Sequence, residues 1–277
     1  MISFREYADR ILGMGIIRSE FKRLLSLRLF FIWVLLTALL IANGADQLYA
    51  VSQTADWNSP AYSVVEFMQY IMSFDKYKTL LVLAAAIPFT GVFCEDYNSG
   101  FLRMILSRTS WKKYIRTVFL INLLTNLFLF GASFFGTGLL LHLKLPLSLR
   151  QNTVGLFYKN LIDHSPLLFL IAGGLQFGII SGMCCSIGIL FSLHQENLFV
   201  TRVLPACIFL VSASYIPRFS AFSVMNMIAM KNVLADFGIQ SPALSFLWGL
   251  LLPFLIIVIT EQLSERKLDW RMKNGMV

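Results

Sequence analysis

Charged side chains are scarce in this sequence. Of its 277 residues only 14% are Asp, Glu, Lys or Arg, whereas 57% are hydrophobic. Soluble domains carry roughly 25% charged residues, so the composition excludes an ordinary soluble domain. The formal net charge is +8, and most of the cations lie beside long apolar runs. They therefore fit the flanks of membrane spans better than a nucleic-acid partner, which would need a separate basic face. The composition predicts a polytopic membrane protein.

Catalytic and nucleotide-binding motifs are also missing. The sequence contains no G-x-x-x-x-G-K-[ST], no H-E-x-x-H and no G-x-S-x-G. Its cysteines and histidines are scattered and lack the spacing of metal ligands: Cys94, Cys184, Cys185, Cys207, His142, His164 and His194. We therefore expect no catalytic residue, no metal site and no cofactor in this chain.

Acidic residues are absent from the long apolar runs, although ion-driven transporters usually place them there. The polar residues inside the runs are mostly uncharged, and Asn122, Asn126 and Gln176 are expected to form hydrogen bonds between helices. We therefore expect the energy source for any transport to reside on another chain.

What the sequence does have is six apolar runs, each near the roughly 20 residues that a membrane-spanning helix needs. They predict an all-α, single transmembrane domain over 1–277 with spans at about 27–44, 77–94, 117–143, 166–193, 198–216 and 243–260. Pro88 interrupts the second run. Residues 61–75 are expected to form an interfacial helix, and 218–240 a re-entrant-like helical segment before the last span.

Residues 1–26 carry apolar side chains at helical spacing with cations between them, which predicts an amphipathic helix at the membrane surface. The distribution of Lys and Arg predicts the orientation. If both termini share one side, that side holds six in 1–28, five in 95–116, Arg202 and four in 261–277, which is 16 of the 23. The positive-inside rule then places both termini and the 95–116 loop in the cytoplasm, and 45–76, 144–165 and 217–242 outside.

The loop 95–116 combines its five cations with an apolar centre. Ser99 is expected to cap a helix that begins at Gly100, and Ser110 a second helix that runs into the third span. At 100° per residue the apolar side chains of the first helix share one broad arc, and these are Phe101, Leu102, Met104, Ile105 and Leu106. Such a helix either rests on lipid headgroups or fits a groove on a cytoplasmic partner.

Small residues recur every four positions in the fourth run, at Gly174, Gly178, Gly182 and Ser186. On a helix they share one face, so another helix can approach closely. The partner is either a helix of the same chain or a second subunit at a dimer seam or along a substrate path.

The loop resembles the first cytoplasmic loop of type-2 ABC transporter permeases, which reads roughly E-x-x-x-G-[ST]-L-+-x-L-L-[SA]-x-P. The matching residues are Glu95, Gly100, Leu102, Arg103, Leu106, Ser107 and Arg108. Glu95 stands one position further from the glycine than usual, Phe101 replaces Thr or Ser, and Thr109 stands where Pro is common. The N-terminal segment is similar to the elbow helix of the family, with Arg18, Glu20, Phe21, Lys22 and Arg23 on it.

The resemblance implies the permease subunit of an ATP-driven exporter in a bacterial plasma membrane. Two permease subunits, identical or paralogous, would bind a separate cytoplasmic ATPase that holds ATP and Mg²⁺, and would pass amphipathic or apolar cargo such as peptide, antibiotic or lipid. The residues implied to couple to the ATPase are Glu95, Gly100, Phe101, Leu102, Arg103, Ile105, Leu106 and Arg108. The alternatives are a non-transporting anchor, sensor or immunity subunit, and then an integral-membrane enzyme.

Overall fold

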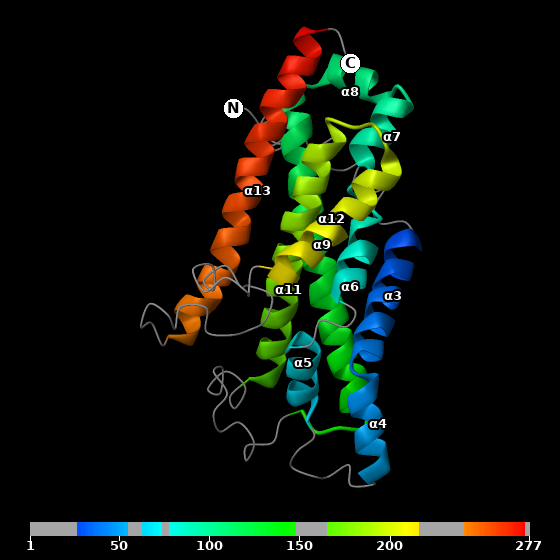
Figure 1. Ribbon diagram of the computed structural model, residues 1–277, viewed down its shortest axis with the longest axis vertical. Helices are drawn as coiled ribbons and strands as arrows, with labels where there is room; N and C mark the ends of the chain where they lie inside the picture. Colours follow the sequence, from blue (N-terminus) through cyan, green and yellow to red (C-terminus); the bar gives the residue numbers. More distant parts are fainter. Residues whose placement is uncertain (1–26, 55–62, 74–77, 148–164, 216–240, 275–277) are drawn as a thin grey trace, which may run out of the picture.

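The computed structural model describes residues 27–54, 63–73, 78–147, 165–215 and 241–274, and the regular elements within these ranges are all α-helices (Figure 1). They are α3 (Leu27–Asn43), α4 (Ala45–Thr54), α5 (Val64–Ser73), α6 (Lys78–Ala86), α7 (Val92–Asn98), α8 (Phe101–Arg108), α9 (Trp111–His142), α11 (Pro166–Ser192), α12 (Leu198–Tyr215) and α13 (Pro242–Lys273). The helix expected in 1–26 and the segment expected in 218–240 lie outside the described residues.

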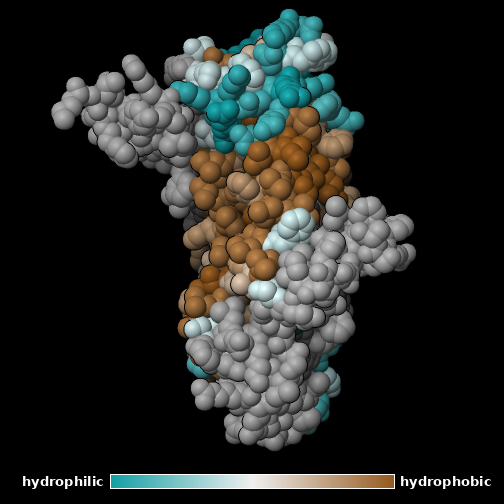
Figure 2. Space-filling model, turned by 90° about the vertical axis from the view of Figure 1, so that its left-hand side faces the viewer, coloured by the Kyte–Doolittle hydropathy of each residue, from teal (hydrophilic) through white to brown (hydrophobic). Residues whose placement is uncertain are grey.

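Three of these helices, α9, α11 and α13, are long and apolar enough to cross a membrane. Shorter apolar helices occupy Leu29–Asn43 and Leu198–Ala213. Figure 2 shows the corresponding surface, where a hydrophobic belt lies below a hydrophilic cap at the end of the bundle that carries α8. The chain is therefore a multi-pass membrane protein, as its composition predicts.

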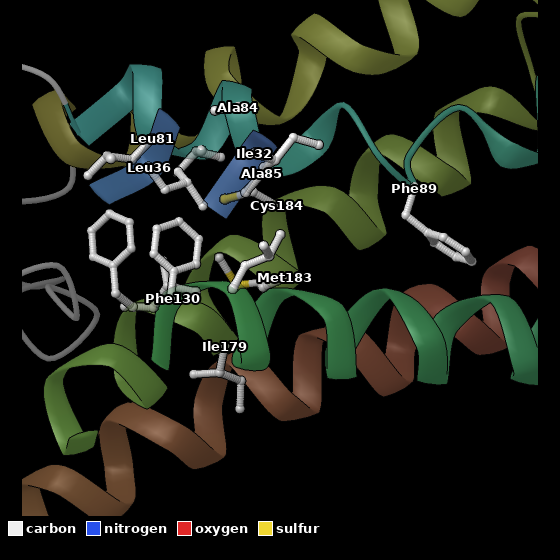
Figure 3. Close-up of a cluster of buried hydrophobic side chains, with 14 of the residues drawn as sticks. Ile32, Leu36, Leu81, Ala84, Ala85, Phe89, Phe130, Ile179, Met183 and Cys184 are labelled. Carbon is white, nitrogen blue, oxygen red and sulfur yellow. The ribbon is translucent and has the colours of Figure 1, made fainter. Parts of the chain in front are cut away.

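Helix α11 lies at the centre of the bundle, packed against α9, α12 and α13. In the most apolar 18-residue stretch of α11, 72% of the residues are buried. The corresponding stretch of α13, which lies along one side of the bundle, has 28% of its residues buried (Figure 1). The core joins side chains from most of the described helices, among them Leu36 of α3, Leu81 of α6, Phe130 of α9 and Met183 of α11 (Figure 3). The ring of Phe130 stacks at a tilt on Phe177 with the centroids 4.9 Å apart.

The second predicted span is broken, as Pro88 predicts. Helix α6 ends at Ala86 and α7 begins at Val92, with a turn over 87–91 between them. Proline lacks a backbone N–H and its ring clashes with the preceding turn, so a continuous helix is unfavourable here. The hydroxyl of Thr90 and its backbone N–H both donate to the carbonyl of Ala86, the last residue of α6.

The last predicted span continues further than its apolar run. The run ends near Thr260, but α13 continues to Lys273. Its buried stripe explains the continuation, because Ile257, Thr260, Ser264, Leu268 and Arg271 recur at helical spacing and all face the bundle. The end of the hydrophobic run therefore did not mark the end of the helix.

Helix α5 lies within the predicted interfacial segment 61–75, but its apolar face is enclosed by protein. Val64, Met68 and Ile71 are each 1% exposed or less. Ser63 and Glu66 form a reciprocal capping box at its start, with the Ser63 backbone N–H donating to Glu66 and the Glu66 N–H donating to the Ser63 hydroxyl. The expected helix is present from Val64 to Ser73, and it packs on α9 and α11.

Candidate functional site

One end of the bundle gathers most of the described charged residues outside the apolar belt (Figure 2). We call it the charged end, and it consists of α7, α8, the first turns of α9, the α11–α12 turn (193–197) and the last turns of α13 (261–273). Every residue of the 95–116 loop lies here, so the charged end is the candidate functional site.

Helix α8 begins at Phe101, and the residue before it has an unusual backbone. Gly100 occupies the N-cap position at φ 70°, in the left-handed region that glycine adopts without strain. Ser99 stands one position earlier than an N-cap, where its hydroxyl accepts the Phe101 N–H at 3.4 Å. The expected cap role of Ser99 is therefore corrected, because Gly100 makes the sharp turn between α7 and α8.

The apolar arc of α8 is divided between the protein and its surface. Leu102 is 1% exposed and Ile105 9%, so these two side chains hold α8 onto the bundle. Phe101 is 39% exposed and Met104 55%, and Arg103 beside them is exposed too. Leu106 is half-buried. Leu102 and Ile105 thus pack α8 onto the bundle, whereas Phe101, Arg103 and Met104 present an exposed face.

Glu95 pairs with Arg202, which lies in the second turn of α12. The Arg202 Nη2 atom donates to the Glu95 Oε1 atom at 2.7 Å, and both side chains are 32% exposed. The sequence places the two residues near the same side of the membrane but 107 positions apart, and the fold brings them into contact. This pair joins the helix before α8 to α12.

Asp96, the next residue, is buried at 2% exposure. It accepts a hydrogen bond from the phenol of Tyr114 at 2.8 Å, which ties α7 to the first turn of α9. A buried carboxylate needs such donors, because desolvation without hydrogen bonds is costly. The sequence reasoning missed this contact. The only signal was an acidic residue adjoining an apolar run.

Arg271 of α13 makes a third connection at the charged end. Its guanidinium donates to the Leu193 carbonyl at 3.0 Å and pairs with Glu196, and it lies 4.9 Å from the centre of the Tyr97 ring. One cation thus contacts the α11–α12 turn and α7 together, with 8% of its side chain exposed. The helical spacing of Arg271 with the buried stripe of α13 was the available signal.

A further ion pair lies on the outside of the same end. Arg116 of α9 donates to Glu265 of α13 at 2.9 Å and lies 3.8 Å from Glu261. The arginine side chain is 64% exposed, so water screens this interaction. It joins α9 to α13 and does not involve α7 or α8.

The glycine stripe of α11 faces α9 of the same chain. A Cβ atom on Gly174 would lie 2.9 Å from the Gly131 Cα atom, and one on Gly178 would lie 3.0 Å from the Asn126 carbonyl oxygen. At Gly182 the nearest atom is a side-chain carbon of Leu123 at 3.4 Å. The stripe therefore packs against a helix of the same subunit, which is the first of the two partners considered for it.

Polar side chains continue this contact between α9 and α11. The Asn122 amide donates to the Gly182 carbonyl at 3.1 Å and to the Ser186 hydroxyl at 3.2 Å. The Ser181 hydroxyl donates to the side-chain amide oxygen (Oδ1) of Asn126 at 2.7 Å. The predicted hydrogen bonds between helices are thus confirmed for both asparagines.

The remaining predicted residues lie apart from this geometry. The residues Arg18, Glu20, Phe21, Lys22 and Arg23 of the expected elbow helix fall outside the described residues, and Arg108 ends α8. Among the residues that the structure describes, no group of three His, Cys, Asp or Glu could hold a metal ion. The charged end thus offers ion pairs between helices and one exposed side of α8.

Comparisons with known proteins add no assignment, since no protein-family model, curated protein or solved structure matches the chain.

Proposed function

We propose that the chain is the permease subunit of an ATP-driven exporter that moves amphipathic or apolar cargo out of the cell. A separate cytoplasmic ATPase, which binds ATP and Mg²⁺, supplies the energy. The observation that carries the proposal is α8, a short helix fastened to the charged end by Leu102 and Ile105 that leaves Phe101 and Met104 exposed. Exposed apolar side chains among cations suit a partner's groove.

The membrane arrangement proposed with it has six spans and both termini in the cytoplasm. The broken pair α6 and α7 forms the second span, and the shorter helices α3 and α12 are the first and fifth. Residues 1–26 supply an elbow helix at the same face, and 218–240 a re-entrant segment. The plasma membrane of a bacterium is the proposed location, with the charged end in the cytoplasm because Lys and Arg favour that side.

The proposed assembly contains a second permease subunit, identical or paralogous, with the cargo path between the two. ATP binding closes the ATPase pair, and α8 transmits the movement to the spans, so the ligand of one chain shifts the conformational equilibrium of another. Apolar or amphipathic cargo is favoured because the apolar runs carry no acidic residue.

The test is purification of the full-length chain in mild detergent from cells that express its genetic neighbours. We expect it to co-elute with an ATPase that carries the P-loop motif absent here, and the complex to hydrolyse ATP. Co-elution with a partner that lacks this motif would favour a non-transporting anchor, sensor or immunity subunit.

A further inference from the structure

The backbone between α6 and α7 departs from a regular helix. The turn over 87–91 interrupts the second span directly before the helix that leads to α8. Few helical hydrogen bonds cross this turn, among them those from the N–H groups of Ile87 and Thr90 to the carbonyls of Ala84 and Ala86. Such a break lets α7 change direction relative to α6. Other contacts must therefore determine where α7 points.

The first turns of α12 provide those contacts. Gly91, the residue before α7, lies so close to α12 that an added Cβ atom would come within 2.6 Å of Leu198 and 3.3 Å of the Arg202 Nε atom. One turn later the Cys94 thiol lies 3.5 Å from the Thr201 hydroxyl. Along this face of α7, the neighbour is the beginning of α12.

The ion pair between Glu95 and Arg202 completes this contact. It is a charged contact between α7 and α12, and its 2.7 Å distance is that of a charge-assisted hydrogen bond. The Nε atom of Arg202 is buried between the two helices, while its Nη2 atom reaches Glu95. The absence of a side chain at Gly91 thus lets the Arg202 guanidinium lie close to the α7 backbone and reach Glu95.

The orientation of α8 depends on that of α7. Only Ser99 and Gly100 separate the two helices, and the Gly100 N–H donates to the Tyr97 carbonyl at 3.1 Å. A displacement of α7 at its break therefore displaces the exposed face of α8. Asp96 and Tyr97 add contacts to α9 and α13 from the next two positions.

We propose that Glu95 and Arg202 are positioning residues that set the orientation of α8 by fastening α7 to α12. The carboxylate of Glu95 is engaged within its own chain, so it positions the docking helix instead of binding the ATPase directly. This inference rests on the proposed function for the identity of the partner, but the fastening itself is a property of the single chain.

The test is hydrogen exchange of the purified full-length protein in lipid nanodiscs, without any ATPase. Arg202→Met keeps much of the side-chain volume and removes the charge. We expect amides in 92–108 to exchange about tenfold faster in this variant, because loss of a charged hydrogen bond raises the population of local openings. Glu95→Gln should act in the same direction, and it serves as the test if Arg202→Met does not fold.

Two further variants distinguish a positioning role of the Glu95–Arg202 pair from a general destabilisation of the protein. The exchanged pair Glu95→Arg with Arg202→Glu should return exchange in 92–108 to near the wild-type rate. Arg116→Met removes the outer pair with Glu265, which does not touch α7, and should leave 92–108 unchanged. The inference is overturned if Arg202→Met and Glu95→Gln leave exchange in 92–108 unaltered, or if Arg116→Met accelerates it equally.

A second arm keeps this inference distinct from the proposed function. With the co-purified ATPase, Arg202→Met should lower ATP hydrolysis and the exchanged pair should restore it. Failure to find an ATPase would contradict the proposed function while leaving the exchange result valid. If an ATPase co-purifies and its rate of ATP hydrolysis is the same with wild type, Arg202→Met and the exchanged pair, the positioning role is contradicted and the proposed function is not.

Discussion

At the scale of single residues, buried polar groups are held by partners on neighbouring helices. Asp96, Asn122 and Asn126 each bind a group on another helix. In a membrane bundle, small residues and hydrogen bonds between helices supply much of the association, because lipid tails are as apolar as the side chains. Changes at these positions should affect stability first and function second.

Tyr114→Phe tests the buried bond to Asp96. The substitution keeps the ring and removes the hydroxyl that donates to the carboxylate at 2.8 Å. We expect a loss of about 1–3 kcal/mol in the free energy of unfolding, since the buried Asp96 carboxylate loses this hydrogen bond. Thermal or denaturant unfolding in detergent measures it. Ser107→Ala, on the exposed side of α8, serves as the control, and equal stability of Tyr114→Phe and wild type would contradict the contact.

Gly174→Ala tests the close approach of α11 to α9. The added methyl would meet the Gly131 Cα atom and the Phe130 carbonyl oxygen, both at 2.9 Å, so backbone must shift. We expect a loss of about 1–3 kcal/mol, as for other overpacked sites. Gly131→Ala is a matched control on the facing helix, because nothing lies within 4 Å of its added Cβ atom. If both variants unfold alike, the stripe does not pack as described.

At the scale of elements, the two sides of α8 should behave differently. Phe101→Asp and Met104→Asp alter exposed side chains, so we expect normal stability with weakened association of the ATPase. Leu102→Asp places a charge at a site that is 1% exposed, so we expect it to destabilise the protein itself. Co-purification yield and unfolding temperature are the two measurements.

Leu143→Asp is the control for these variants. It makes the same chemical change at a residue that is 80% exposed, at the opposite end of α9 from α8. Its ATPase association should equal that of wild type. Equal loss of association in Leu143→Asp and Met104→Asp would show that α8 has no special role.

Helical periodicity was sufficient to predict α8, and the proline at position 88 to predict the interruption of the second run. Neither signal predicted which part of the apolar arc faces inward. Phe101 and Leu102 are equally apolar neighbours, and only the positions of α7 and α9 decide that Leu102 is buried. Likewise, the apolar run of the last span ends near Thr260, but α13 extends to Lys273 because the buried side chains on its inner face continue beyond that residue. The partner of Glu95 depends on tertiary contacts far along the chain, which no local pattern contains.

At the scale of the whole molecule, the charge distribution predicts the orientation in the membrane. We expect Asn98→Cys, at the charged end, to react with a membrane-impermeant maleimide only after the cells are permeabilised, because Lys and Arg favour the cytoplasmic side. Leu143→Cys, at the other end, should react in intact cells. Both are made with the four native cysteines replaced by alanine. The reverse labelling pattern would place the charged end outside the cell, where α8 could not contact a cytoplasmic partner.

The central claim is that a separate ATPase binds the exposed face of α8, and crosslinking at that face tests it most directly. A photo-reactive amino acid replaces Met104, which is 55% exposed, in the full-length chain in living cells. The account predicts that irradiation joins the chain to a protein carrying a P-loop, and that the same probe at Leu143 does not. Crosslinks from Met104 to lipid alone, with no protein adduct, would contradict it.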